Sequence, residues 1–234
     1  AIGYAAMTTN TAGGTKNIAL GNYAMDALTS ADNCVGIGYA ALGATTTGVD
    51  NTAVGTKTLL DNTTGAYNAA FGTDSMKDNT TGDFNTAIGR AALQFNTTAD
   101  SNTAVGRNAL YANTTGASNV AVGALALDAN TTAAYNVAVG SEALGANTTG
   151  ASNTAVGYAA LSANTTAGQC VAIGRSALAA NTTGARNIAI GANALDASDG
   201  ETDNIAIGFE AMTTNTAGAI QNIAIGTYSM DSAI

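Results

Sequence analysis

The amino-acid sequence predicts an all-β protein, a parallel β-solenoid of about 13 to 14 coils with 17 residues in each coil. Three observations lead to this fold class. The chain carries a strict internal repeat, each repeat contains a short alternating segment rich in β-branched residues, and turn-forming residues join one repeat to the next. We expect residues 1–234 to form a single continuous solenoid segment.

One Gly in each unit marks the repeat. The intervals between these glycines are 17 residues, except for 18 at the first and the last. A unit of this length is too short for a pair of helices, so each unit is expected to form one coil that is stabilised by its neighbours. The marker glycines are Gly3, Gly21, Gly38, Gly55, Gly72, Gly89, Gly106, Gly123, Gly140, Gly157, Gly174, Gly191, Gly208 and Gly226.

A strand is predicted immediately before each marker Gly. In the segment 51–55, Asn-Thr-Ala-Val-Gly, alternation places Thr and Val on one face and Asn, Ala and Gly on the other. The residue two before the marker is Ala in every unit except at Gly36. We expect a surface to approach these small residues closely, either the opposite wall of the same coil or another chain.

The rest of the unit is predicted to form a second short strand and a turn. The fourth residue after the marker Gly is always Leu or Met. The residue immediately before the marker Gly is always apolar. We expect the Leu/Met and Val/Ile side chains to stack into continuous apolar ladders, with Leu/Met on the second strand. Segments such as Asn-Thr-Thr-Gly at 62–65 supply the turn.

Four residues before the marker, Asn fills eleven of thirteen units and Cys the other two. Stacked Asn side chains can satisfy backbone groups along the axis, and Cys is expected to replace Asn as a small ladder residue. The two Cys are eight coils apart and cannot pair within one chain, which leaves pairing between copies as the alternative. The predicted ladder includes Asn51, Asn68, Asn85, Asn102, Asn119, Asn136, Asn153, Cys34 and Cys170.

A longer period lies behind the short one. Residues 3–29 match residues 208–234, and both segments contain Met-Thr-Thr-Asn-Thr-Ala-Gly and an 18-residue unit. The offset of 205 residues equals eleven units of 17 and one of 18. We therefore expect a super-repeat of twelve coils and a chain that is part of a longer array.

The stretch 153–166, Asn-Thr-Ala-Val-Gly-Tyr-Ala-Ala-Leu-Ser-Ala-Asn-Thr-Thr, resembles repeats of tail-fibre-like proteins of bacteria and phages. It is also similar to the shorter head repeat of trimeric autotransporter adhesins. The resemblance implies a left-handed parallel β-roll, often a homotrimer, displayed on a bacterial or virion surface for reach and attachment. The present unit is longer than the adhesin unit, and the extra length falls in the Asn-Thr-Thr-Gly turn.

Composition argues against an enzyme. The chain has no His and only 10% charged residues, so the most adaptable acid–base group and metal ligand is absent. The net charge of −9 disfavours nucleic acid, and no apolar run is long enough to insert into a membrane. No cofactor is expected.

The sequence therefore favours a structural, extracellular fibre or filament segment at a cell surface or on a virion. Expected partners are further copies, in a side-by-side homotrimer or an end-to-end filament, and a glycan or protein receptor on a host surface. The alternative is a ligand-binding solenoid that recognises glycan or ice along repeated Thr or aromatic rows.

Two kinds of side-chain row are candidates for ligand binding. Tyr67, Phe84 and Tyr135 share one position, where they would form a sugar-stacking stripe or cover a turn or a subunit seam. Eight Asn-Thr-Thr triplets formally match the N-glycosylation pattern at Asn62, Asn79, Asn96, Asn113, Asn130, Asn147, Asn164 and Asn181, although turn chemistry also explains them. The Thr that follows each of these Asn residues, and the next Thr in turn, form two predicted exposed hydroxyl rows; the first consists of Thr63, Thr80, Thr97, Thr114, Thr131, Thr148, Thr165 and Thr182.

The only acidic cluster lies near the C-terminal end, at Asp196, Asp199, Glu201 and Asp203. Carboxylates at short spacing around a Gly can bind calcium. Their spacing does not match an EF-hand loop, and a solvated charged turn is the competing interpretation.

Overall fold

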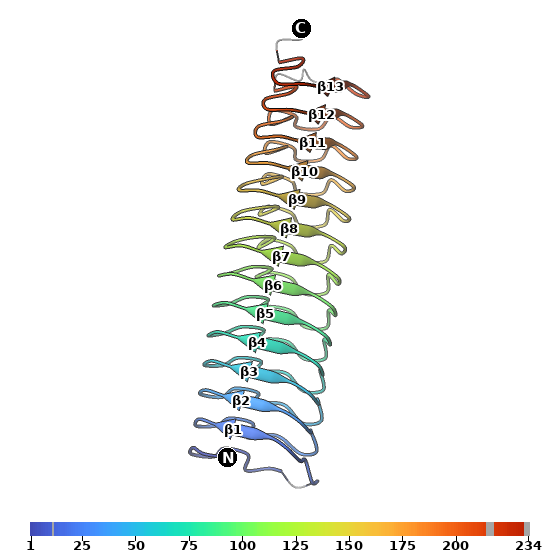
Figure 1. Ribbon diagram of the computed structural model, residues 1–234. Coiled ribbons are helices and arrows are strands. Elements are labelled where there is room, and N and C mark those ends of the chain that lie inside the picture. The colour runs from blue at the N-terminus through green and yellow to red at the C-terminus, as the bar shows by residue number, and fades with distance from the viewer. Residues whose placement is uncertain (11, 214–217, 232–234) are drawn as a thin grey trace. The chain divides into compact units, whose positions relative to one another are not determined.

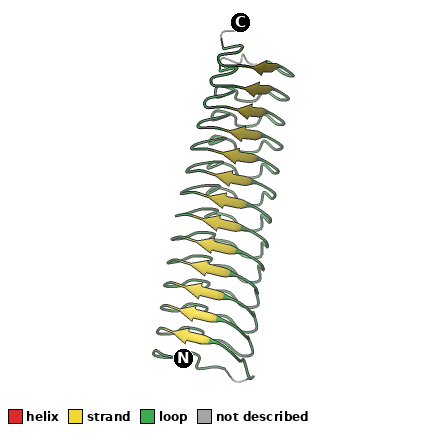
Figure 2. Ribbon diagram, viewed as in Figure 1, coloured by secondary structure: helices red, strands yellow, loops and turns green. Residues whose placement is uncertain are grey.

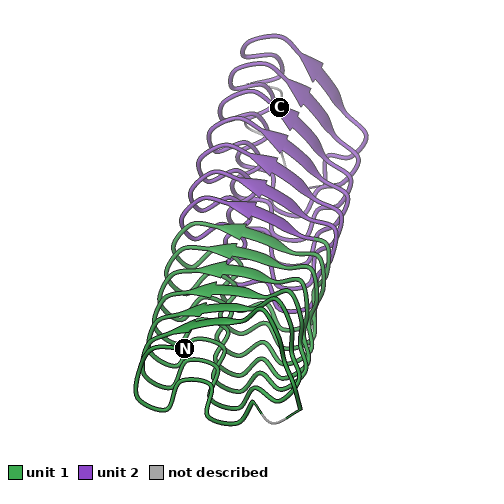
Figure 3. Ribbon diagram, turned by 60° about the horizontal axis from the view of Figure 1, so that its bottom comes forward, with its two compact units in different colours: residues 1–118 green, residues 119–234 purple. Residues whose placement is uncertain are grey.

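The computed structural model describes residues 1–10, 12–213 and 218–231. The fold class is confirmed: the described chain is an all-β parallel solenoid with one three-residue strand per coil and no helix (Figures 1 and 2). Two compact units are present, residues 1–118 and 119–234 (Figure 3). The expectation of one continuous segment stays a prediction.

Unit 1 holds six strands and unit 2 holds seven, each of three residues. Unit 1 contains β1 (Ile18–Leu20), β2 (Val35–Ile37), β3 (Thr52–Val54), β4 (Ala69–Phe71), β5 (Thr86–Ile88) and β6 (Thr103–Val105). Unit 2 contains β7 (Val120–Val122), β8 (Val137–Val139), β9 (Thr154–Val156), β10 (Val171–Ile173), β11 (Ile188–Ile190), β12 (Ile205–Ile207) and β13 (Ile223–Ile225).

Strands pair in parallel so that equivalent positions of successive coils lie side by side. In unit 1, Val35 pairs with Thr52, one repeat further along the chain. In unit 2, Ile205 pairs with Ile223 across the last, 18-residue repeat. The register therefore follows the repeat position even where the repeat is one residue longer.

The middle residue of each strand points into the coil. Ala53 has no exposed surface, whereas Thr52 and Val54 on either side of it are only half-buried. A Cβ atom built on Gly36 would lie 3.0 Å from the Met25 side chain. The surface that approaches the small residues is therefore the opposite wall of the same coil, which is the first of the two predicted alternatives.

The two predicted apolar ladders differ in burial. The Leu/Met ladder is confirmed, because twelve of these side chains have at most 1% exposure: Met25, Leu42, Leu59, Met76, Leu93, Leu110, Leu127, Leu144, Leu161, Leu178, Leu195 and Met212. The Val/Ile side chains lie at equivalent positions of successive strands, but on the outer side of the sheet and not in the core. Strand alternation turns them outward once Ala faces inward, and Ile88 and Ile190 are 43% and 36% exposed.

The predicted second strand is absent from the described residues, and a series of turns replaces it. Lys57 and Leu59 have φ values of 55° and 50°, which no β-strand adopts. The Lys57 amide donates to the Tyr39 carbonyl of the preceding coil at 2.8 Å, and the Leu59 amide donates to the Ser75 carbonyl of the following coil at 3.0 Å. The left-handed residues thus direct successive amides to both neighbouring coils, which offsets their cost of about 1 kcal/mol each.

The first Asn ladder, at the residue before each strand, is buried and hydrogen-bonded. Asn68 Oδ1 accepts from the Asn85 amide at 2.9 Å, and Asn68 Nδ2 donates to the Gly82 carbonyl at 2.8 Å. Each side chain thus joins its coil to the next and also crosses the coil interior. The bond from the Asn85 amide satisfies a backbone group that would otherwise lose this partner in the buried interior.

A second Asn ladder runs along the turns, and the sequence reading missed it. It consists of the Asn residues of the Asn-Thr-Thr triplets, which have no exposed surface. Asn79 Nδ2 donates to Asn62 Oδ1 at 2.8 Å and to the Gly82 carbonyl at 3.1 Å. The signal was present in the sequence, because the same amide residue recurs at a fixed position of the unit, as in the first ladder.

Candidate functional site

In each unit, the outer side of the sheet is a surface of uniform chemistry. We call it the sheet face: the first and third residues of each strand, which point away from the coil. These positions hold Val, Ile, Leu, Thr, Ala or Phe in all thirteen described strands, and none holds a charged residue. In a chain of net charge −9, this surface is uncharged.

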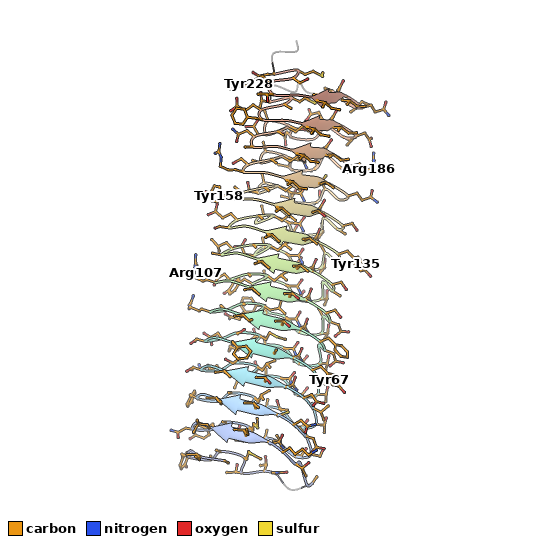
Figure 4. The ribbon with its side chains drawn as sticks, in the orientation of Figure 1. Tyr67, Arg107, Tyr135, Tyr158, Arg186 and Tyr228 are labelled. Carbon is orange, nitrogen blue, oxygen red and sulfur yellow. The ribbon has the colours of Figure 1, made fainter. Side chains whose placement is uncertain are left out.

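Two edges with aromatic and charged side chains border the sheet face (Figure 4). In unit 1, Tyr67 lies at one edge and Arg107 at the other. In unit 2, Tyr135 and Arg186 lie at one edge, opposite Tyr158 and Tyr228. Large polar side chains therefore gather beside the sheet face and not on it.

The predicted aromatic row occupies the edge that contains Tyr67. Tyr67 and Phe84 stack in parallel, with ring centroids 4.9 Å apart and an interplanar angle of 1°. Each ring covers one face of the other, so the pair offers a sugar only the remaining faces. Tyr135 is 68% exposed.

A second aromatic group at the opposite edge was not anticipated. Tyr23 makes edge-on contacts with Tyr4 and Tyr39, at centroid distances of 5.5 and 5.9 Å. In unit 2, Phe209 and Tyr228 form an equivalent contact at 5.5 Å. Phe209 and Tyr228 follow Tyr4 and Tyr23 by the 205-residue offset, so the super-repeat also repeats this contact.

The first Thr row differs in exposure from the fully exposed row that the sequence suggested. Thr63, Thr80, Thr114, Thr148 and Thr182 are half-buried. The Thr63 hydroxyl donates to the Thr80 carbonyl at 3.0 Å, and the Thr148 hydroxyl donates to the Thr165 carbonyl at 3.0 Å. The second Thr of each triplet, as at Thr64, is the exposed one.

Glycosylation at the Asn-Thr-Thr triplets does not fit the fold. The acceptor nitrogen of Asn79 is buried and donates to two acceptors inside the coil. A sugar attached there would replace one of the two amide hydrogens, break at least one of these hydrogen bonds and have to lie in the core. The turn interpretation of these triplets is therefore the correct one.

The acidic turn does not bring its carboxylates together as a metal site. Glu201 is 8% exposed, and its Oε2 accepts from the Ser198 hydroxyl at 3.1 Å and from the Asp199 amide at 2.9 Å. Asp203 pairs instead with Arg186, with Nε and Oδ1 2.6 Å apart. Asp199 accepts from the Thr182 hydroxyl at 2.7 Å, and Asp196 is not among these partners. No group of three potential metal ligands occurs in the described parts of the chain.

Glu201 makes the stability of this turn depend on pH. Burial raises the pKa of Glu201, but the amides of the turn and of Gly218 outweigh burial and hold its pKa below the ordinary value. The stabilisation is then complete above the unfolded pKa of about 4.3 and is lost as pH falls through the lower folded pKa. We expect Glu201→Gln to flatten the decrease in the free energy of unfolding below about pH 4.3, measured by urea denaturation. An unchanged pH profile would contradict this role.

Both cysteines occupy the first Asn ladder and have no exposed surface. The Cys170 thiol donates to the Gly184 carbonyl at 3.3 Å, and the Cys170 amide donates to Asn153 Oδ1 at 2.9 Å. Burial raises the pKa of both thiols, Cys34 and Cys170. Disulfide formation between copies would require a coil to open.

Restoring Asn at Cys170 should stabilise the protein. A thiol is a weak acceptor, whereas an Asn Oδ1 would accept fully from the next ladder residue. We expect Cys170→Asn to raise the free energy of unfolding by about 1 kcal/mol in urea denaturation. Cys170→Ala, which removes the polar atom, is the control and should lower the free energy of unfolding. A gain in both variants would show that the thiol itself, and not the missing amide, limits stability.

The comparisons with known proteins identify no relative. No protein-family model matches the chain, and neither the curated proteins nor the solved structures contain a match. In residues 1–10, 12–213 and 218–231, no helix is long and apolar enough to cross a membrane.

Proposed function

We propose that the chain is a structural segment of an extracellular fibre or filament, on a bacterial cell surface or a virion, which provides reach and attachment. The observation that carries the proposal is the repeated internal hydrogen bonding. Asn79 and Asn85 each join adjacent coils; Asn79 also bonds within its own turn, and Asn85 bonds to the Ala99 carbonyl fourteen residues further along the chain. A coil joined in this way resists bending and local opening, which is the property that a shaft needs.

The resemblance of residues 153–166 to tail-fibre and adhesin repeats supports the extracellular assignment. Polar groups of the turns are used within the fold, as at Thr63 and Glu201. We therefore propose a mechanical role without catalysis, in which copies of the chain associate side by side or end to end.

Electron microscopy of the purified chain tests this proposal. Straight particles of uniform width are expected, together with slow proteolysis at a protease concentration that digests a globular control. A variant with a broken ladder, Asn85→Leu, should give bent particles and faster cleavage. Collapsed or flexible wild-type particles would contradict a shaft role.

A second function is glycan or ice recognition, and two features favour it: the exposed second Thr of each triplet and the exposed Tyr67–Phe84 pair. Glycan-array binding that is lost in Tyr67→Ala, but kept in a matched edge variant, Tyr158→Ala, would establish it. Thermal hysteresis that is lost in Thr64→Lys would point to ice instead. The absence of both signals would leave the shaft role alone.

A further inference from the structure

One strand of the sheet face departs from the rest in a complementary way. In β4 the first outward position is Ala69, where the neighbouring strands have Thr52 and Thr86. The third outward position is Phe71, where the neighbours have Val54 and Ile88. One outward position has therefore become smaller and the other larger within the same strand.

We propose that the sheet face binds a second copy of this chain in parallel and in register, with Phe71 of each copy seated over Ala69 of the other. The inference rests on the proposed side-by-side association, and it adds the surface, the orientation and the register. A twofold rotation about an axis parallel to the solenoid axis brings the sheet faces of two copies together. It places the third outward residue of one copy opposite the first outward residue of its neighbour, at the same coil. An enlarged third position then needs a reduced first position in the partner.

Packing within the coil follows the same rule. At the inward position of β2, Gly36 replaces the usual Ala, and the Met25 side chain fills the space, 3.0 Å from where a Cβ would stand. A small residue in this chain is thus matched by a larger one opposite. On the sheet face, Phe71 remains 40% exposed in the single chain, so its own chain leaves much of the ring uncovered.

Charge favours a second copy as the occupant. Two chains of net charge −9 repel each other, and the sheet face is a surface where no charged side chain must be buried.

A double-mutant cycle on association tests the pairing. Ala69→Thr should overpack against the partner's Phe71, and Phe71→Val should leave a void, so each should weaken association by about tenfold or more in sedimentation equilibrium. The double variant restores the Thr/Val pair found at Thr52 and Val54 and should return within about threefold of wild type. Thr64→Lys, on another surface, is the control and should associate normally.

Cross-linking tests the register. In a Cys34→Asn, Cys170→Asn background, mixed Ala69→Cys and Phe71→Cys chains should form a disulfide between copies. Thr52→Cys, one coil away, should not cross-link efficiently to Phe71→Cys. Equal yields would overturn a unique register.

Three other outcomes would overturn the pairing itself. The first is a wild-type chain that stays monomeric at concentrations well above micromolar, and the second is a double-mutant cycle in which the effects of Ala69→Thr and Phe71→Val on the association constant simply add. The third is a cycle in which the two substitutions are coupled only in the unfolding free energy of the monomer. The last result would show that Phe71 packs on Ala69 of its own chain. Monomers that are nevertheless straight in the microscope would overturn this inference and leave the shaft proposal intact.

Discussion

Replacing Gly89 with Ala is expected to lower the free energy of unfolding by more than about 3 kcal/mol. Gly89 has a φ of 134°, a conformation that side chains rarely adopt. An added Cβ would also lie 2.6 Å from the carbonyl oxygen of Gly106 in the next coil. Strain and a backbone clash therefore act together, and relief of the clash would separate two coils.

Gly145→Ala is the matched control, measured by urea denaturation alongside Gly89→Ala. A Cβ at Gly145 would meet its nearest atoms at 3.4 Å, and the same repeat position holds Ser162 and Ala179. This change should stay within about 0.5 kcal/mol of wild type. Equal losses in the two variants would show that backbone entropy, and not coil geometry, determines the effect.

Replacing Asn85 with Leu should cost about 1 to 3 kcal/mol, because the buried Asn102 amide, 2.9 Å from Asn85 Oδ1, loses this partner. The Ala99 carbonyl loses its bond from Asn85 Nδ2 at 2.9 Å but keeps the one from Asn96 Nδ2 at 3.0 Å. Leu has a similar size to Asn but cannot hydrogen-bond. Hydrogen exchange should detect the damage first in the coils that carry these two groups.

Asn85→Cys separates lost hydrogen bonding from altered packing. The chain already accepts Cys at this ladder position, where the Cys34 thiol donates to the Gly48 carbonyl at 3.3 Å. We expect Asn85→Cys to cost less than half as much as Asn85→Leu. A loss as large as that of the Leu variant would contradict the view that the thiol is a partial substitute.

Periodicity in the sequence was enough to predict the coil, the parallel register and the buried Leu/Met ladder. Each depends on a residue type that recurs at one position, as Ala53 and Leu59 do. Which side of the strand faces inward was harder to predict, since the alternation left open whether the Ala side meets the opposite wall of its coil or another chain. A coil this thin has room only for Ala beneath the strand, so Val54 points outward.

The φ angles of the turns and the hydrogen bonds of the Thr and Glu side chains could not be predicted from side-chain patterns alone. The conformational propensity of Leu gives no reason to expect a positive φ at Leu59. Hydrogen bonds to the next coil, which the sequence does not reveal, select this conformation. The Thr63 hydroxyl seemed free in the sequence, yet a carbonyl one coil away accepts from it. Glu201 seemed to be a surface charge until the fold placed amides around its carboxylate.

The register between strands has an evolutionary consequence. Since Val171 pairs with Ile188 one whole repeat later, a crossover between two copies of the repeat within the gene would delete or duplicate one complete coil. Both Asn ladders would rejoin without a mismatch, and only the length would change. Genes for such chains are therefore expected to show length polymorphism in multiples of seventeen codons, while each individual coil keeps its structure.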